Sequence, residues 1–430
     1  MTKPDHVGGT RAVIIVCDGL RRDLIGPATT PFLARFGQSA AVFGNARSVF
    51  PSLTRVSAAS LATGCHPNHH GLLGNTMVLN GARGLECHSA GHPEFRDRLR
   101  SVTGRTLWRP ALADYVQSSG GAVALSNVSP GGAYFLDPDN HGHVYHRAGS
   151  YSPGGRRISG AAALEIDSGA AGDLVMTARF CDDVLRRQQP ALAILWLSEP
   201  DWTGHQTPLG SPEYRAALHT GDRCVGEVVA AIDALDPGGD RILRVLCSDH
   251  GAVTVSRTID VASALIDAEL KDAPSSNDVV VAPNGTAALI YVDRLHRSRI
   301  AAIADFLRTQ DWVGDVFAGD ALAGINLPGD TDLAVAVTLQ TDSQPNVHGV
   351  VGHGAMAFDP DDPVDYGGHG MHGGLGFGEQ QPFLFIAGRD FPPGSRGDAV
   401  SLVDIAPTVL QHLGLPAGGM DGRPLQRSRA

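Results

Sequence analysis

Residues 11–17 read RAVIIVC, and Asp18 follows them directly. After Arg11 the stretch carries no charge, and valine and isoleucine dominate it. A short continuous run of this kind favours a strand buried on both faces, as in the middle of a parallel sheet. The stretch therefore predicts a central strand whose carboxyl end carries an acidic side chain.

Similar apolar runs recur along the chain and alternate with segments of helical period. Strands are predicted at 11–17, 41–50, 121–126, 191–198 and 241–247, and helices at 29–39, 54–63, 173–188 and 211–235. Strands that alternate with helices of this length predict an α/β fold with a doubly wound, mostly parallel sheet flanked by helices. In such sheets functional residues gather at the carboxyl ends of the strands.

Residues 275–345 have a different pattern, because three short strand-like runs surround one helical segment at about 296–309. This pattern predicts a small α+β cap inserted into a larger core formed by residues 1–274 and 346–430. Residues 128–160 are rich in Gly, Ser, Pro and His, which predicts a long loop near the mouth of a site.

The composition narrows the class of protein. There are 34 Lys and Arg against 45 Asp and Glu, a net charge of -11, which argues against a nucleic-acid partner held by general electrostatics. No run approaches the roughly 20 apolar residues of a membrane span, and the first residues lack an apolar signal core. We therefore expect a cytoplasmic protein without a membrane partner. The sequence is compatible with a homo-oligomer as well as with a monomer.

The six cysteines form no C-x-x-C pair. Cys17 and Cys247 lie inside apolar runs, so buried reduced thiols are the expectation.

Acidic residues and histidines follow three of the predicted strands. They are Asp18 after 11–17, Asp201 and His205 after 191–198, and Asp249 and His250 after 241–247. Since the carboxyl ends of parallel strands share one edge of the sheet, these side chains are expected to lie together. An ordinary surface loop at DWTGH (201–205) and a solvated turn at SDHG (248–251) are the alternatives. Gly251 permits the sharp turn that two adjacent ligands of one ion need.

Residues 367–374, GGHGMHGG, place two more histidines in a glycine-rich loop. Either His369 or His372 would bring the set to six ligands, although a flexible surface loop remains the alternative. Carboxylates and imidazoles without a thiolate suit Zn²⁺, with Mn²⁺ as the second candidate. Six ligands are too many for one tetrahedral site and suit two three-ligand sites.

The stretch FPSLT, residues 50–54, places Thr54 at the start of a predicted helix after a proline turn. A helix N-terminus favours an anionic substrate, and a metal bound to the hydroxyl would lower its pKa. Thr54 could then act as a nucleophile without a histidine base. The alternative is that Thr54 is an N-cap and has no chemical role.

The motifs together resemble the alkaline phosphatase superfamily, and within it the type I phosphodiesterase/nucleotide pyrophosphatase and phosphonoacetate hydrolase-like branch. The matching stretches are VCDGL (16–20), FPSLT (50–54), ATGCHPNHHGLLGN (62–75), DWTGH (201–205), SDHG (248–251) and the HGG that begins at residue 372. They occur in the order typical of that superfamily and cover almost the whole chain. The sequence also lacks the C-x-P-S-R or S-x-P-S-R motif of a sulfatase.

The resemblance implies a binuclear metal site, most simply of two Zn²⁺ ions. One ion would be held by Asp201, His205 and His372, and the other by Asp18, Asp249 and His250, with Thr54 touching the second. His372 is preferred to His369 because its spacing to the following EQQPF matches the family. The resemblance further implies hydrolysis through a covalent phospho-threonine intermediate, with Asn75 donating a hydrogen bond to a phosphoryl oxygen.

The substrate is expected to be a small anionic phosphorus compound. Nucleotide-cleaving relatives commonly carry an aromatic residue directly after the nucleophile, whereas this chain has Arg55. A guanidinium there would suit a second anionic group. Tyr145 and His146, with Arg147, are further candidates for substrate binding, and an ordinary polar loop is the alternative.

Three functions therefore stay open. The first is a phosphodiesterase or nucleotide pyrophosphatase-like hydrolase, and the second is a hydrolase of a small phosphonate, like phosphonoacetate, or of a phosphomonoester. The third belongs to another class, a non-catalytic metal-binding protein. A complete ligand set with Thr54 between the ions argues against the third, since a binding protein has no use for a nucleophile.

Overall fold

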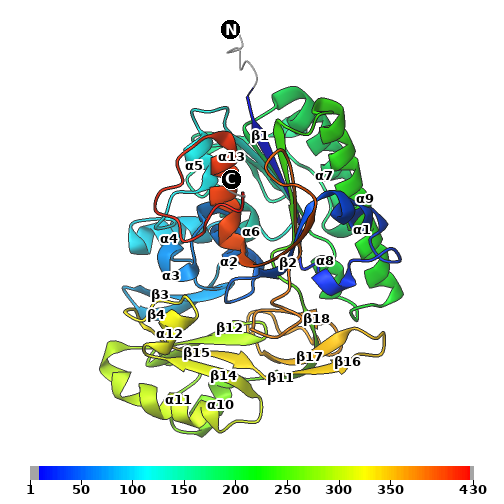
Figure 1. The fold of residues 1–430 in the computed structure, drawn as a ribbon. Helices are drawn as coiled ribbons and strands as arrows, with labels where there is room; N and C mark the ends of the chain where they lie inside the picture. The colour runs from blue at the N-terminus through cyan, green and yellow to red at the C-terminus, as the bar shows by residue number, and fades with distance from the viewer. Residues whose placement is uncertain (1–8, 427–430) are drawn as a thin grey trace.

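The computed structural model describes residues 9–426. Its largest element is a ten-stranded sheet, shown in Figure 1. The strands are β1 (Arg11–Cys17), β2 (Ala41–Arg47), β5 (Ala122–Ser126), β6 (His143–Tyr145), β7 (Ser150–Ser152), β8 (Arg156–Ile158), β9 (Leu192–Leu197), β10 (Ile242–Cys247), β19 (Leu384–Ala387) and β20 (Gly394–Ser401). Their order across the sheet is β20-β2-β19-β10-β1-β9-β5-β6-β7-β8.

Strand β1 lies in the middle of this sheet, as its apolar sequence predicts. It pairs in parallel with β10 on one side and with β9 on the other, and β5 and β6 continue the parallel order. Strand β19 breaks that order because it runs antiparallel to both β10 and β2. The predicted α/β fold with a mostly parallel sheet is confirmed.

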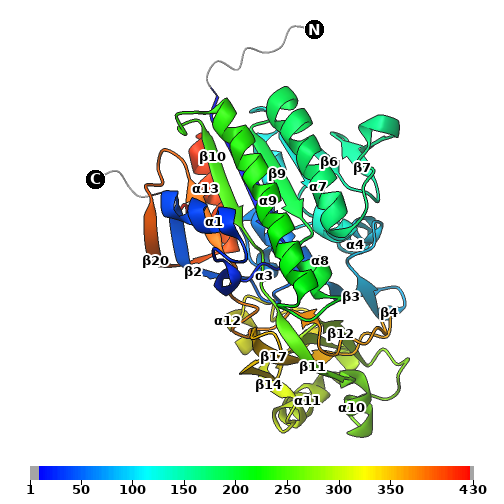
Figure 2. The same cartoon turned by 90° about the vertical axis from the view of Figure 1, so that its right-hand side faces the viewer.

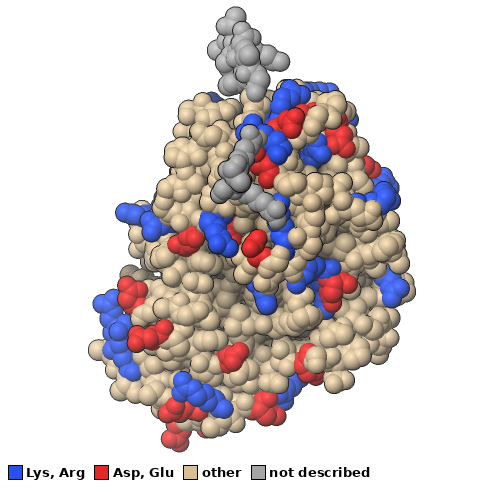
Figure 3. Space-filling view, viewed as in Figure 1, with Lys and Arg blue, Asp and Glu red and all other residues tan. Residues whose placement is uncertain are grey.

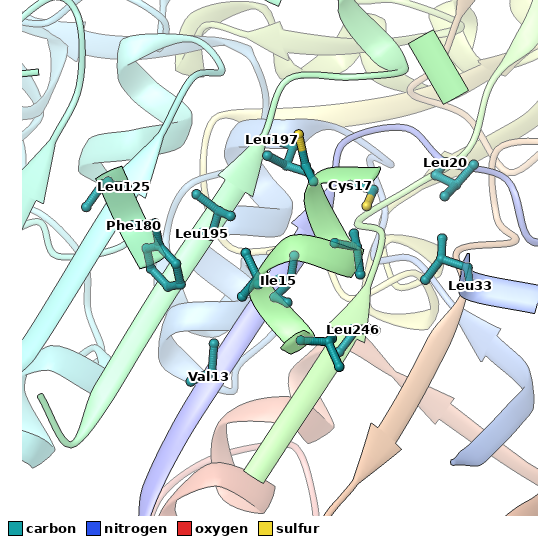
Figure 4. Packing of buried hydrophobic residues seen from close by; sticks show 14 of the residues in the cluster. Val13, Ile15, Cys17, Leu20, Leu33, Leu125, Phe180, Leu195, Leu197 and Leu246 are labelled. Atoms are coloured by element: carbon teal, nitrogen blue, oxygen red, sulfur yellow. The ribbon is translucent and has the colours of Figure 1, made fainter. Parts of the chain in front are cut away.

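One face of the sheet is covered by helices, which Figure 2 shows in front of the strands. They are α1 (Pro31–Phe36), α7 (Gly169–Arg179), its π-helical continuation η4 (Phe180–Gln188) and α9 (Pro212–Leu235). Alternate side chains of β1, Val13, Ile15 and Cys17, pack into this layer, where Figure 4 shows Ile15 among Leu195, Leu246 and Phe180. Burying each large apolar side chain contributes about 1.5–3 kcal/mol, so both faces of β1 anchor the sheet.

The opposite face of the sheet receives the other side chains of β1, Ala12, Ile14 and Val16. The helices on this side are α2 (Thr54–Thr63), α5 (Leu112–Val116) and α13 (Ile405–Leu413). Shorter helices connect the layers: α3 (Pro67–His70), α4 (Phe95–Thr103), α6 (Pro130–Tyr134) and α8 (Asp201–Gly204). Helices on both faces make the sheet doubly wound.

A second body lies below the large sheet in Figure 1 and contains two four-stranded sheets. The sheet β12-β13-β15-β14 is formed by β12 (Val279–Asn284), β13 (Ala287–Val292), β14 (Val313–Ala318) and β15 (Leu333–Leu339), with helix α11 (Ile300–Arg308) against it. The sheet β16-β17-β11-β18 is formed by β11 (Val253–Ile259), β16 (Thr341–Pro345), β17 (Val351–Ala357) and β18 (Gly370–Met371). Helices α10 (Val261–Asp267) and α12 (Ala321–Gly324) complete this body.

The first of these sheets falls within residues 275–345, where the sequence predicts strands around one helix. The second sheet takes β11 from before that range and β17 and β18 from after it. The division of the chain into a core and an inserted cap at these residues therefore stays a proposal.

A hairpin joins the two bodies. Its strands are β3 (Thr76–Gly81) and β4 (Gly84–Ser89). Met77 and Leu79 of β3 belong to the same apolar cluster as Leu289 and Tyr291 of β13. Since β1 enters from the top of Figure 1, the carboxyl ends of the parallel strands point toward the second body.

Some local predictions differ from the structure. The segment 29–39 forms α1 and a 3₁₀ turn, η2 (Gly37–Ser39), and the strand predicted at 41–50 ends at Arg47. All six cysteines are free, and five are buried, Cys87 being partly exposed. None of the helices within residues 9–426 combines the length and apolar composition needed to cross a bilayer. On the face drawn in Figure 3, acidic and basic side chains are interspersed.

Candidate active site

The acidic strand ends meet at one edge of the large sheet. The register pairs Val16 with Cys247 and Cys17 with Leu197, so β1, β10 and β9 end nearly level. Asp18 follows β1, Asp201 opens α8 shortly after β9, and Asp249 and His250 follow β10. His372 reaches the same place from the chain after β18.

Two glycines allow this close assembly. Gly19 has φ +66°, and a Cβ there would lie 2.8 Å from Oδ1 of Asp201. Gly251 does not adopt the left-handed backbone conformation. The sharp turn expected from the sequence therefore does not explain why this position is a glycine. A Cβ on Gly251 would instead collide with the carbonyl oxygen of Gly378. Close packing of two backbones therefore explains the glycine after His250.

Asp18, Asp249 and His250 form one compact group of potential metal ligands. One ligand atom from each lies within 4.8 Å of the others. Nε2 of His250 is 3.1 Å from Oδ2 of Asp249 and 3.4 Å from Oδ1 of Asp18. All three residues are buried.

A second group surrounds Asp201. Ligand atoms of Asp201, His250 and His372 lie within 4.8 Å of one another. Nε2 of His205 is 3.1 Å from Oδ2 of Asp201, and Nε2 of His372 is 3.6 Å from Oδ1 of the same carboxylate. The structure thus brings the six ligand residues expected from the sequence to one place, with His250 between the two groups.

The three histidines share one tautomer. Each Nδ1 faces a backbone carbonyl oxygen, which can only accept, so each Nδ1–H must donate. The pairs are His205 with Gly370 at 3.0 Å, His250 with Gly251 at 3.0 Å and His372 with Ser52 at 2.8 Å. Nε2 of each ring then faces the carboxylates, which is how metal-binding histidines are held.

The electrostatics of the site call for cations. Oδ2 of Asp249 is buried and lies 3.1 Å from Nε2 of His250. Burial and the neighbouring Asp249 and Asp201 raise the pKa of Asp18 well above its ordinary value. Burial lowers the pKa of His250, but the neighbouring Asp249 and Asp201 act together in the opposite direction, and the net effect raises that pKa to about 9. Divalent cations bound here would offset this concentration of buried negative charge.

Two hydrogen bonds orient the carboxylates of the first group. The indole Nε1–H of Trp196 donates to Oδ2 of Asp18 at 3.1 Å. The backbone N–H of Gly19 donates to Oδ1 of Asp249 at 3.1 Å. Each carboxylate therefore keeps its other oxygen toward His250.

Thr54 is not the N-cap of its helix. Helix α2 begins at Thr54, and Leu53 occupies the N-cap position. Oγ1 of Thr54 lies instead 3.1 Å from Nε2 of His250 and 3.4 Å from Oδ1 of Asp18. The hydroxyl thus touches the first ligand group, at the positive end of a ten-residue helix.

Asn75 and Arg55 lie beside Thr54. The backbone N–H of Arg55 donates to Oδ1 of Asn75 at 3.3 Å, which leaves the amide Nδ2 of Asn75 as a donor. The guanidinium Nη1 of Arg55 donates to the backbone oxygen of Asn75 at 2.8 Å. Both residues line the cavity beside Thr54.

Tyr145 and His146 are not brought to the site. Tyr145 ends β6 and packs in the core, with the guanidinium of Arg179 above its ring. His146 is buried, and its Nε2–H donates to the backbone oxygen of Val128 at 2.8 Å. Burial lowers the pKa of His146 to about 4, so the ring is neutral and structural.

The cavity beside Thr54 has two lobes. The arginine lobe, about 430 Å³, is lined by Arg55 and Arg147 together with Asn75, Ser89, Ser129, Trp202, the Thr54 hydroxyl and several of the ligand residues. The acidic lobe, about 610 Å³, is lined by Asp359, Asp361, Asp362, Tyr366, Asn284 and other residues of the second body. Arg55, Asn75, Trp202, His205 and His372 line both. A substrate at Thr54 therefore sits between a cationic and an acidic wall.

The sequence matches the model of one known protein family. The model of the type I phosphodiesterase / nucleotide pyrophosphatase family matches residues 12–375. The chain belongs to this family. The match places it within the alkaline phosphatase superfamily, and family members are hydrolases that act on phosphoric esters.

Individual relatives support the assignment to the type I phosphodiesterase / nucleotide pyrophosphatase family. Ectonucleotide pyrophosphatase/phosphodiesterase family member 1 of Mus musculus is 25% identical over 240 residues, which is 54% of this chain. The matched region spans only 23% of the length of that relative.

Two solved structures of murine ectonucleotide pyrophosphatase / phosphodiesterase 5 share the fold. They are 16% identical to this chain, with TM-scores of 0.68 and 0.69, and each covers 96% of this chain and 97% of the other. The second is described as an inactive variant in complex with AMP. These likenesses establish the shared fold.

Sequence reasoning missed Trp196 and Trp202. Trp196 lies inside the apolar run of β9, so its pattern indicates only a core residue, although its N–H orients Asp18. Trp202 follows the potential ligand Asp201, and it is 42% exposed at the cavity. The sequence did offer a signal for Trp202, because this aromatic residue lies inside the DWTGH motif.

Proposed function

We propose that this protein is a two-metal phosphodiesterase or nucleotide pyrophosphatase-like hydrolase that uses Thr54 as its nucleophile. The observation that carries the proposal is the position of Oγ1 of Thr54, 3.1 Å from His250 and 3.4 Å from Asp18 at the wall of the cavity. A hydroxyl against two potential metal ligands suits nucleophilic attack better than capping or packing.

Six residues would hold the ions. Asp201, His205 and His372 would bind one, and Asp18, Asp249 and His250 the other. Bound divalent cations would lower the pKa of the Thr54 hydroxyl, so that no separate base is needed, and would neutralise charge on the leaving oxygen. The ligand types favour Zn²⁺, with Mn²⁺ as the second candidate.

The residues of the chain would then carry two in-line steps. Oγ1 of Thr54 attacks phosphorus while the bond to the leaving oxygen breaks, which gives a phospho-threonine. Water attacks that phosphorus next, and the bond to Oγ1 breaks to release the phosphorus product and restore the hydroxyl. Nδ2 of Asn75 donates to a non-bridging oxygen that gains charge in both transition states.

The relatives support a phosphodiester substrate. The matching family is named for phosphodiesterases and nucleotide pyrophosphatases, and one solved structure with this fold holds AMP. The half-exposed indole of Trp202, which lines both lobes, offers a surface on which a flat substrate group could stack.

A second candidate is hydrolysis of a small phosphonate or phosphomonoester. Arg55 favours it, because this guanidinium stands directly after the nucleophile and lines the cavity. Such substrates carry more negative charge near phosphorus than a simple diester, and arginine recognises that charge well.

Turnover of three substrates tests the proposal. The metal-loaded protein is assayed with bis-(p-nitrophenyl) phosphate, p-nitrophenyl phosphate and phosphonoacetate. Preference for the diester by orders of magnitude supports the first function, and preference for either other substrate supports the second. With metal bound, no turnover of any of them would leave a non-catalytic metal-binding protein.

A cytoplasmic location is also proposed. The six free cysteines fit a reducing compartment, where thiols persist. Cell fractionation with a reducing-compartment marker tests this, and recovery of the protein with disulfide-bonded secreted proteins would contradict it.

A further inference from the structure

Two arginines of the arginine lobe converge on one short segment, residues 127–129. Nε of Arg55 donates to Oγ of Ser129 at 3.1 Å. Nη1 of Arg147 donates to the backbone oxygen of Val128 at 3.1 Å and to Oδ1 of Asn127 at 2.8 Å. The two guanidiniums come from positions 92 residues apart in sequence, yet the same segment holds both at one wall of the cavity.

Neutral oxygens hold these arginines in place. Within residues 9–426, neither Arg55 nor Arg147 forms an ion pair with a carboxylate, although Asp359 and Asp173 act on them from a distance. Arg21 shows the contrast, because it is fully buried and pairs with Asp23 at 2.7 Å. A partly buried cation without a counter-ion has lost hydration that no opposite charge replaces, so binding of an anion beside it is favourable.

Each guanidinium also retains unused donors. Nη1 of Arg55 donates to Asn75 and Nε to Ser129, which leaves Nη2 beside Gly91. All the hydrogen bonds of Arg147 in the described chain are made through Nη1, so Nε and Nη2 remain. Since a guanidinium has five N–H donors in a rigid fork, these are the donors that a carboxylate or phosphate would accept from.

We propose that Arg55 and Arg147 together bind a second anionic group of the substrate, a carboxylate or a phosphate that remains attached to the reacting phosphorus through a short linker. The inference rests on the proposed function, because it places that phosphorus at Thr54. The acidic lobe would repel such a group through Asp359, Asp361 and Asp362, so the group enters the arginine lobe.

Two esters that share the same leaving group test the proposal. The esters are p-nitrophenyl methylphosphonate, which has a neutral substituent on phosphorus, and p-nitrophenyl carboxymethylphosphonate, which adds a carboxylate. Release of p-nitrophenolate gives kcat/KM for each, and their ratio isolates recognition of the carboxylate. We expect Arg55→Gln and Arg147→Gln each to lower the ratio by about 10- to 100-fold, as loss of a hydrogen bond between charged groups does.

A matched control is Arg223→Gln, which removes an exposed arginine of α9 that pairs with Glu227. Its ratio should equal that of the unchanged protein. If the unchanged protein shows no more preference for the carboxylate ester than hydroxide does in solution, the proposal is wrong, whether or not either arginine variant folds. Equal ratios in both variants and in the control would also overturn it.

A binding measurement separates this proposal from the proposed function. Calorimetric titration of the metal-loaded Thr54→Ala protein compares phosphonoacetate with methylphosphonate and needs no turnover. Tighter binding of phosphonoacetate that disappears when Arg147→Gln is added supports the arginine site even if neither ester is hydrolysed. If the Thr54→Ala protein binds both anions equally while the unchanged protein hydrolyses both esters, the arginine site is wrong. The proposed function would still stand in that case.

Discussion

The imidazole rings of His250 and His372 stack on each other, with centroids 3.7 Å apart and planes 15° apart. His250 follows β10 of the large sheet, whereas His372 follows β18 of the second body. Both rings present Nε2 to the carboxylates while Nδ1 holds a backbone oxygen. The two ligand groups therefore share a wall, and each ring fixes the position of the other.

The first prediction concerns the choice between the two late histidines. His372→Ala should remove one of two bound ions, because Nε2 of His372 is 3.6 Å from Asp201. His369→Ala is the matched control and should keep both, since His369 lies outside both cavity lobes. Metal analysis of the purified variants by mass spectrometry measures this. Full metal content in His372→Ala with a loss in His369→Ala would reverse the assignment.

The second prediction concerns the nucleophile. Thr54→Ala should lower kcat by about a thousandfold or more on any phosphorus substrate, because it removes the attacking atom. Metal content should remain, since the six ligands are untouched. Thr54→Ser should restore part of the activity and should yield a phosphorylated serine when the reaction is quenched in acid. Activity of Thr54→Ala close to that of the unchanged protein would rule out a covalent threonine intermediate.

The third prediction concerns Trp196, which positions a ligand without touching substrate. Trp196→Phe keeps the ring in the core but removes the N–H that holds Oδ2 of Asp18. Loss of such an orienting partner should weaken metal binding about 10- to 100-fold, measured by competition with a chelator. Trp312→Phe, in the core of the second body, is the control and should leave metal affinity unchanged. Equal affinities in the two variants would show that Trp196 only fills space.

The fourth prediction is that Asp249→Asn changes the free energy of unfolding in opposite directions with and without bound metal. Without metal, Asp249→Asn should raise the free energy of unfolding by about 1–2 kcal/mol, because it removes one of the buried carboxylate charges that crowd Asp18. With metal, the same change should lower stability, since a ligand is lost. Urea unfolding with and without a chelator measures both, and Asp311→Asn, at an exposed carboxylate, should change neither. The same sign in both conditions would argue against a metal at Asp249.

Much of the fold follows from local patterns. β1 matches its predicted range because seven consecutive residues with few polar atoms favour burial on both faces. Helix α2 ends at Thr63 as predicted, since Gly64 adopts the left-handed conformation that terminates helices. Asp18, Asp249 and His250 directly follow strands predicted from the sequence, and the carboxyl ends of neighbouring parallel strands share one edge of the sheet.

Other features depend on contacts between distant segments, which local patterns do not encode. Strand β19 inserts antiparallel between β2 and β10, and nothing in LFIA specifies those neighbours. Tyr145 and His146 look like polar loop residues, yet Tyr145 of β6 packs in the core and the Nε2–H of His146 donates to the backbone oxygen of Val128. The convergence of Arg55 and Arg147 needs the three-dimensional position of residues 127–129.

The ligand residues are spread along nearly the whole chain, from Asp18 to His372. During synthesis the first of them leaves the ribosome hundreds of residues before the last, so a growing chain holds exposed carboxylates but no complete site. His372 follows the strands β11 to β18 of the second body in the chain, so all six residues are present only after that body has been synthesised. If the proposed ions bind, tight binding would therefore report that folding is finished, and truncated or stalled chains would be recognisable to the cell by their failure to retain metal.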